Sequence, residues 1–213
     1  MQNKVLPKKV IFLGETNFIL DVAFQQDANC EYLFRLADEH RMQMVLPEYA
    51  VAEAEGTGVQ RLLNQLRDLE PALSALRQFR RSAYHEVDDL IRGIEQLAEK
   101  VKTIEIPLVV ERISNLQQRA AIIPLTPEIL LQVELREAKQ IPPFKKGDIR
   151  IYESILKFAA ENQGSGVTLV FLTRDRKDFD HLPIHAELQG VEVELFFSAG
   201  DCVRRIRELL GFG

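Results

Sequence analysis

Carboxylates stand at several points in the chain where an apolar segment gives way to a polar turn. Residues 167–178 show this most clearly, because six mostly apolar residues run into a tip with two acids among three cationic side chains. Five acids have a place at the end of such a segment or in the helical pattern that follows or precedes one: Glu15, Glu53, Asp148, Asp175 and Asp178. Acids gathered without partners would repel one another and raise each other's pKa, whereas a divalent cation would neutralise them.

The kind of metal follows from the ligand atoms on offer. All-oxygen ligands select hard cations, so we expect Mg²⁺ or Mn²⁺ rather than zinc. No histidine or cysteine falls at these tips, and Cys30 and Cys202 form no CxxC pair. A zinc site or a disulfide framework is therefore not expected.

Length and charge limit what the chain can be. Its 213 residues suit one large domain, or one domain with an insertion, and its net charge of -5 gives no general nucleic-acid character. Binding of a polyanion would have to rely on a local basic patch. The N-terminus lacks the apolar core of a signal peptide, and no run approaches membrane-spanning length, so we expect a cytoplasmic protein without a membrane partner.

The acids need a scaffold that brings them together, and strand and helix patterns alternate along the chain. Short β-favouring segments lie at residues 10–13, 42–46, 121–124, 167–172 and 191–197. Helical patterns fill the intervals between them, and Pro47 suits the first turn of one such helix. Right-handed crossovers then predict an α/β fold with a parallel sheet and helices on both faces. Working groups of such sheets sit beyond the carboxyl ends of the strands.

Residues 57–119 differ from the rest of the chain in the spacing of their apolar residues. Leucines recur at steps of four and three, at Leu62, Leu66, Leu69, Leu73 and Leu76. A second such series is Val87, Leu90, Ile94, Leu97 and Val101. These stripes predict an antiparallel helical hairpin, in which Pro71 should kink or restart the first helix. A solvated helix pair is the simpler interpretation, although three arginines are candidates for phosphate contacts: Arg77, Arg80 and Arg81.

Taken together, the motifs resemble those of the PIN-domain nucleases. Four of them occur in the family's order: Glu15-Thr16-Asn17, Pro47 with Glu53 six residues later, Gly147-Asp148, and Thr173-Arg174-Asp175-Arg176-Lys177-Asp178-Phe179. The last motif is the most specific, since it follows a buried strand and ends in Asp-Phe. The resemblance covers most of the chain outside residues 57–119, which look like an insertion in a single PIN-like domain over residues 1–213.

The resemblance implies a Rossmann-like five-stranded parallel sheet and metal-dependent cleavage of a phosphodiester, usually in RNA. Direct metal ligands would be Glu15, Asp148 and Asp175. Glu53 and Asp178 would act through water, and Asn17 and Thr173 would support the site. The substrate backbone would contact a rim of cations: Lys145, Lys146, Arg150, Arg174, Arg176 and Lys177. Many relatives are dimers, so a homodimer is a further expectation.

One residue departs from the family's pattern, because the first acid is normally Asp and here it is Glu15. Its extra methylene moves the carboxylate by about one bond length, whereas the groups of a functional site must be placed to within about 0.5 Å. This departure raises the alternative of a catalytically impaired module that binds RNA or protein. A toxin of a toxin–antitoxin pair, controlled by an antitoxin-like partner, is a third interpretation. Singly, each acid also suits a surface ion pair or a helix start.

Overall fold

Five parallel strands form one sheet in the computed structural model, which describes residues 9–79 and 85–212. The strands are β1 (Val10–Gly14), β2 (Gln43–Pro47), β3 (Ala121–Ile123), β4 (Thr168–Leu172) and β5 (Val193–Phe196). Their order across the sheet is β3-β2-β1-β4-β5, and every neighbouring pair is parallel. The predicted five-stranded α/β fold is therefore confirmed.

The order of the strands reverses between β1 and β4, which lie side by side at the centre of the sheet. Their register pairs Gly14 with Leu172, so both strands end at the same level. Residues that follow these two strands, Glu15 and Thr173, consequently lie at the same edge of the sheet. Open α/β sheets bind ligands at such a point, outside the carboxyl ends of the strands.

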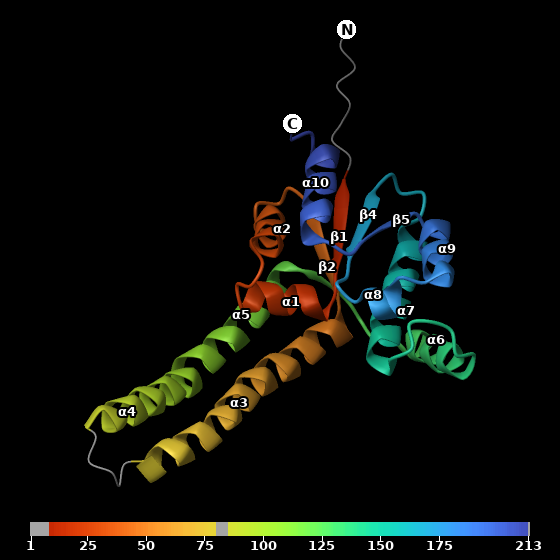
Figure 1. The fold of residues 1–213 in the computed structure, drawn as a ribbon. Coiled ribbons are helices and arrows are strands. Elements are labelled where there is room, and N and C mark those ends of the chain that lie inside the picture. The colour runs from red at the N-terminus through yellow and green to blue at the C-terminus, as the bar shows by residue number, and fades with distance from the viewer. Residues whose placement is uncertain (1–8, 80–84, 213) are drawn as a thin grey trace.

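Helices cover both faces of the sheet (Figure 1). They are α1 (Thr16–Ala23), α2 (Ala28–Asp38), α6 (Pro127–Ala138), α7 (Lys146–Asn162), α8 (Arg176–Phe179), α9 (Leu182–Gly190) and α10 (Ala199–Leu210). Helix α10 contacts α2 and the strands β1, β4 and β5, whereas α7 contacts β2 and β3. Because the chain reverses direction across the sheet after β3, right-handed crossovers place α7 on the opposite face from α2.

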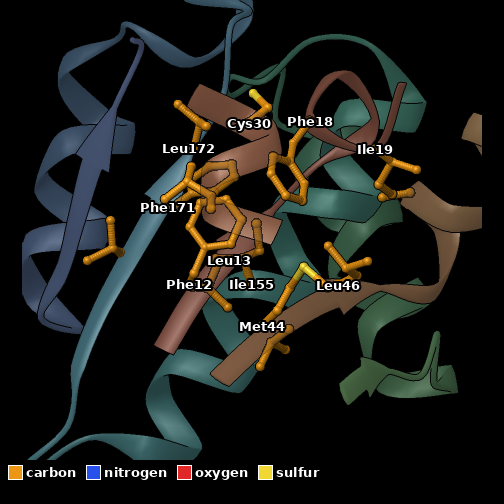
Figure 2. Close-up of a cluster of buried hydrophobic side chains, with 14 of the residues drawn as sticks. Phe12, Leu13, Phe18, Ile19, Cys30, Met44, Leu46, Ile155, Phe171 and Leu172 are labelled. Carbon is orange, nitrogen blue, oxygen red and sulfur yellow. The ribbon is translucent and has the colours of Figure 1, made fainter. Parts of the chain in front are cut away.

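The core lies between these layers and is most apolar around β1 and β4. All five residues of β1 are buried, as are Leu169 to Leu172 of β4. Figure 2 shows Phe12, Phe18 and Phe171 together in this core, with Met44 and Leu46 of β2 beside them. Burying each large apolar side chain contributes roughly 1.5–3 kcal/mol, so the two central strands hold the residues that follow them in fixed positions.

A long helical arm extends from the edge of the sheet that is formed by the carboxyl ends of the strands. Helix α3 (Glu48–Phe79) leads away from the sheet, and α4 (His85–Lys100), the π-helical η1 (Val101–Glu105) and α5 (Ile106–Arg119) return beside it (Figure 1). Residues 80–84, with the predicted phosphate contacts Arg80 and Arg81, lie outside the described residues. Arg77 pairs with Glu95 of α4 at 2.8 Å. None of the described helices is long and apolar enough to cross a membrane.

One local prediction for α3 is wrong, and a second is wrong in part. Pro47 ends β2 instead of opening the helix, and α3 begins one residue later at Glu48. Proline lacks a backbone N–H, and that is compatible with the last position of a strand as well as with a helix start. Helix α3 also continues through Pro71 without the predicted restart, and Leu62 and Leu73 are buried on either side of it. The predicted boundary at residue 57 thus falls inside a continuous helix.

Candidate metal centre

Three carboxylates meet beyond the end of β4. Oxygen atoms of Asp148, Asp175 and Asp178 all lie within 4.8 Å of one another. Asp148 lies in the first turn of α7, while Asp175 precedes α8 and Asp178 lies within it. The acids therefore come from two separate segments of the chain, and we call them the three-acid cluster.

Local hydrogen bonds explain how the tip of β4 presents two of these acids together. The Thr173 hydroxyl is buried and accepts a hydrogen bond from the backbone N–H of Asp175 at 3.1 Å. The Asp175 carboxylate in turn accepts from the backbone N–H of Asp178, also at 3.1 Å, and so caps α8. This turn places both carboxylates on the side that faces α7.

Lys145 supplies the positive charge at the centre of the cluster. Its ammonium lies 2.9 Å from an Asp175 oxygen and 3.4 Å from Asp148 Oδ2, and it also donates to Asp178. Hydrogen bonds to Asp178 and Asp175 hold the pKa of Lys145 well above its usual range. The sequence interpretation assigned this lysine to the substrate backbone, whereas in the structure it contacts all three acids.

Asp148 is the least satisfied member of the cluster. Burial raises its pKa to about 6, repulsion from Asp178 and Asp175 adds to the rise, and Lys145 opposes it. Its Oδ2 atom is buried, and its contact with the Lys145 ammonium at 3.4 Å is an ion pair without hydrogen-bond geometry. In Asp175, by contrast, burial raises the pKa, but hydrogen bonds from Lys145 and the backbone of Asp178 outweigh burial and lower it.

Glu15 lies next to the three-acid cluster without belonging to it. One of its oxygens accepts hydrogen bonds from the backbone N–H of Asn17 at 2.9 Å and from the Asn17 side chain at 3.3 Å. The other accepts from the backbone N–H of Arg174 at 3.4 Å. Burial raises the pKa of Glu15 to about 7, and repulsion from Asp148 contributes to the rise. Asn17 and Thr173, the two predicted supporting residues, thus hold Glu15 and the Asp175 turn.

Glu53 approaches the same region from α3. Its carboxylate accepts a hydrogen bond from the hydroxyl of Thr16, at the start of α1. A Cβ atom at Gly147 would lie 3.0 Å from Glu53 Oε1 and 3.3 Å from the Tyr49 ring. Glycine at this position therefore lets Glu53 rest against the first turn of α7, one residue before Asp148.

Most of the predicted basic rim is engaged in contacts within the chain. Lys146 pairs with Glu134 and Glu137 of α6 at 2.8 and 3.0 Å. The Arg150 guanidinium lies 4.8 Å from the centre of the Tyr49 ring.

The tip of β4 carries the remaining three rim cations. Arg174 pairs with Asp21 at 3.0 Å and with Asp27, and Arg176 pairs with Asp180 at 3.4 Å. Lys177 alone among the six has no side-chain ion pair or ring contact within the described part of the chain. The sequence interpretation did not predict that Lys145 contacts the three acids. The three-residue interval from Lys145 to Asp148 at a helix start was the available signal for this contact.

The donor set fits a hard divalent cation. It consists of carboxylate oxygens, it already surrounds one positive charge, and it includes a buried oxygen that lacks a hydrogen bond. Mg²⁺ and Mn²⁺ take such ligands, whereas zinc prefers nitrogen and sulfur. Of the three predicted direct ligands, the structure gathers Asp148 and Asp175. Asp178 takes the third place, and Glu15 lies beside them.

Comparison with known families agrees with this geometry. A family model described as PIN domain matches residues 11–179, which include all five predicted acids. The matched segment runs from β1 to the end of α8 and thus contains the whole three-acid cluster. Searches of curated proteins and of solved structures found no match to the chain.

Proposed function

The chain belongs to the PIN domain family, and from this premise we propose that it is a Mg²⁺- or Mn²⁺-dependent ribonuclease. The observation that carries the proposal is the three-acid cluster at the point where the strand order reverses. Members of the family are generally nucleases, and hard cations held by carboxylates are the usual means of cleaving a phosphodiester in water.

The acids of the site would have different roles in binding the cation. Asp148, Asp175 and Asp178 would hold the cation, with Glu15 and Glu53 at the border of the site. A cation bound there would polarise the phosphate and lower the pKa of the attacking water. The same charge would favour the ionised form of Glu15, whose pKa burial raises to about 7.

Lys145 has two positions in this proposal. While it neutralises the three acids it occupies the place that a divalent cation needs. A cation held by Asp148, Asp175 and Asp178 would repel the ammonium and favour its displacement from the cluster. Its side chain is 59% exposed and long enough to turn towards solvent, where it can contact a phosphate of the substrate. That second position is the substrate-binding role that the sequence suggested.

Cleavage assays with one variant and one matched control test the proposal. Asp175→Asn keeps the cap of α8, because an amide oxygen also accepts from the backbone N–H of Asp178. We expect wild-type protein to cleave labelled single-stranded RNA with Mn²⁺ and not with EDTA. Asp175→Asn should lose cleavage and keep its melting temperature. Asp180→Asn removes an exposed acid of the same segment and should cleave as the wild type does.

One observation favours a second candidate, the catalytically impaired binding module. Glu15 stands where the family has Asp, and it stays outside the three-acid cluster. If this candidate holds, the wild-type chain will bind RNA and cleave neither RNA nor DNA at any concentration of Mn²⁺. A homodimer and an antitoxin-like partner remain proposals that the oligomeric state in solution and the neighbouring reading frames would test.

A further inference from the structure

A basic groove of about 810 Å³ lies away from the carboxylates, between α2, α5 and α10. Four arginines line it against two acids, Glu31 and Asp38. The arginines are Arg35, Arg112, Arg119 and Arg207. Figure 1 shows α2 and α10 beside each other on one face of the sheet. On a chain with a net charge of -5, this is a local concentration of positive charge.

The arginines of the groove differ in whether they already contact an acidic or polar partner within the chain. Arg119 pairs with Asp38, and Arg112 donates to the backbone carbonyl of Ala23 at 2.9 Å. Arg35 and Arg207 make no ion pair with any residue that the structure describes, and both are exposed. Two positive charges therefore remain available to an anionic ligand.

Aromatic rings lie beneath two of the four guanidinium groups. The Arg35 guanidinium is 5.1 Å from the centre of the Tyr32 ring, and that of Arg119 is 5.7 Å from the Phe34 ring. A neighbouring groove of about 570 Å³ shares Tyr32, Arg35 and Arg207. It adds Arg41, whose guanidinium lies 5.7 Å from the Phe212 ring. Flat cation–aromatic pairs thus continue along the surface from one groove into the next.

One side chain connects this surface to the metal centre. Arg174 immediately precedes Asp175, and its backbone N–H donates to Glu15. Its guanidinium pairs with Asp27, which caps α2, and the next residue, Ala28, lines the groove. The groove therefore begins one residue along the chain from an ion-pair partner of Arg174.

We propose that this arginine–aromatic groove holds a single-stranded segment of RNA that flanks the phosphate to be cleaved. The inference rests on the proposed nuclease function and extends it to a substrate-binding surface. Arginines neutralise the phosphates, and planar guanidinium and aromatic faces stack on bases. Bases offer their faces to a protein when they are unpaired, so the groove selects single strands over duplex RNA. The groove along α3 at Glu53 is less suited, because it offers one cation, Arg61, against Glu53 and Asp68.

Binding should be measured in the Asp175→Asn background, in which the oligonucleotide is expected to stay intact. The probe is a fluorescent single-stranded RNA of roughly 12 nucleotides, and the readout is anisotropy over a range of salt concentrations. The test variant is Arg35→Ala with Arg207→Ala. The control variant is Arg67→Ala with Arg92→Ala, which removes the same charge from exposed positions on the arm.

We expect the test variant to bind at least about tenfold more weakly and the control to bind as the parent does. Loss of two phosphate contacts should also reduce the slope of log K against log salt by about 1.4. Both variants should keep the parent's melting temperature, which excludes misfolding as the cause. Equal binding by test and control variants would overturn the proposal.

Two competitors decide the chemistry of the occupant. Duplex RNA of the same length and a polyglutamate peptide should displace the probe poorly. Displacement by the duplex at the same concentration as single-stranded RNA would overturn the single-strand assignment. Equal displacement by the peptide would identify an acidic protein as the partner instead. Groove-dependent binding by a wild-type chain that cleaves no RNA would uphold the groove and contradict only the nuclease function.

Discussion

Replacing Lys145 with methionine should strengthen the binding of Mn²⁺. The lysine makes three contacts with the acids, at 2.9 Å, at 3.4 Å and through its hydrogen bond to Asp178. Ion pairs with an exposed partner contribute about 0.2–1 kcal/mol each, and Lys145 is 59% exposed. A cation that must displace the ammonium from all three contacts therefore loses about 0.6–3 kcal/mol, which corresponds to roughly 3- to 150-fold in Kd. Methionine keeps most of the length of the side chain, lacks the ammonium and so removes this competition.

Isothermal titration with Mn²⁺ at neutral pH measures the difference. Lys146→Met is the matched control, because Lys146 is the next residue and pairs with Glu134 and Glu137 of α6 rather than with the cluster. Lys145→Met should also melt at a lower temperature in EDTA, since three carboxylates lose their counter-ion, and should gain more than the wild type on adding Mn²⁺. An unchanged or weaker Mn²⁺ affinity in Lys145→Met, or an equal gain in Lys146→Met, would refute the reasoning.

Two further substitutions test the border of the site. Because burial raises the pKa of Glu15 from 4.5 to about 7, its contribution to stability is present below pH 4.5 and lost as pH rises through 7. In EDTA this loss in the free energy of unfolding should reach at most about 3 kcal/mol. Urea unfolding at several pH values should show a smaller loss for Glu15→Gln than for the wild type. An equal pH dependence in both proteins would contradict this assignment. Gly147→Ala should cut Mn²⁺-dependent cleavage and give no gain in stability, because the new Cβ would lie 3.0 Å from Glu53 Oε1. Gly93→Ala, with no atom within 4 Å of its Cβ, should gain about 0.5–1 kcal/mol and cleave normally.

The pattern of the sequence was sufficient to predict the sheet and the edge of the sheet at which the acids lie. Apolar runs such as residues 167–172 identify buried strands, and parallel strands end at one edge, so Glu15 and Asp175 had to lie near each other. The start of α3 was harder to place, because a proline is equally compatible with the end of a strand and the first turn of a helix. Its continuity through Pro71 depends on tertiary packing in the arm.

Side-chain detail within the site was not predictable from spacing. Asp178 joins the cluster because the Thr173 hydroxyl and the Asp175 carboxylate fold the tip of β4 into a tight turn. Glu15 stays beside the cluster because Asn17 and the backbone of Arg174 hold its carboxylate. A lysine beside acids in the sequence suggests a substrate-binding rim, and only its rotamer and the loop before α7 direct the Lys145 ammonium inward.

The most direct measurement is anomalous scattering from a crystal soaked in Mn²⁺. We predict a peak bound by oxygen atoms of Asp148, Asp175 and Asp178, with the Lys145 ammonium moved out of the cluster. Equivalent data from a crystal soaked in EDTA should show no peak and the lysine among the three acids. A Mn²⁺-soaked crystal without density at the cluster, in which Lys145 still contacts all three carboxylates, would contradict the assignment of this site as a metal centre.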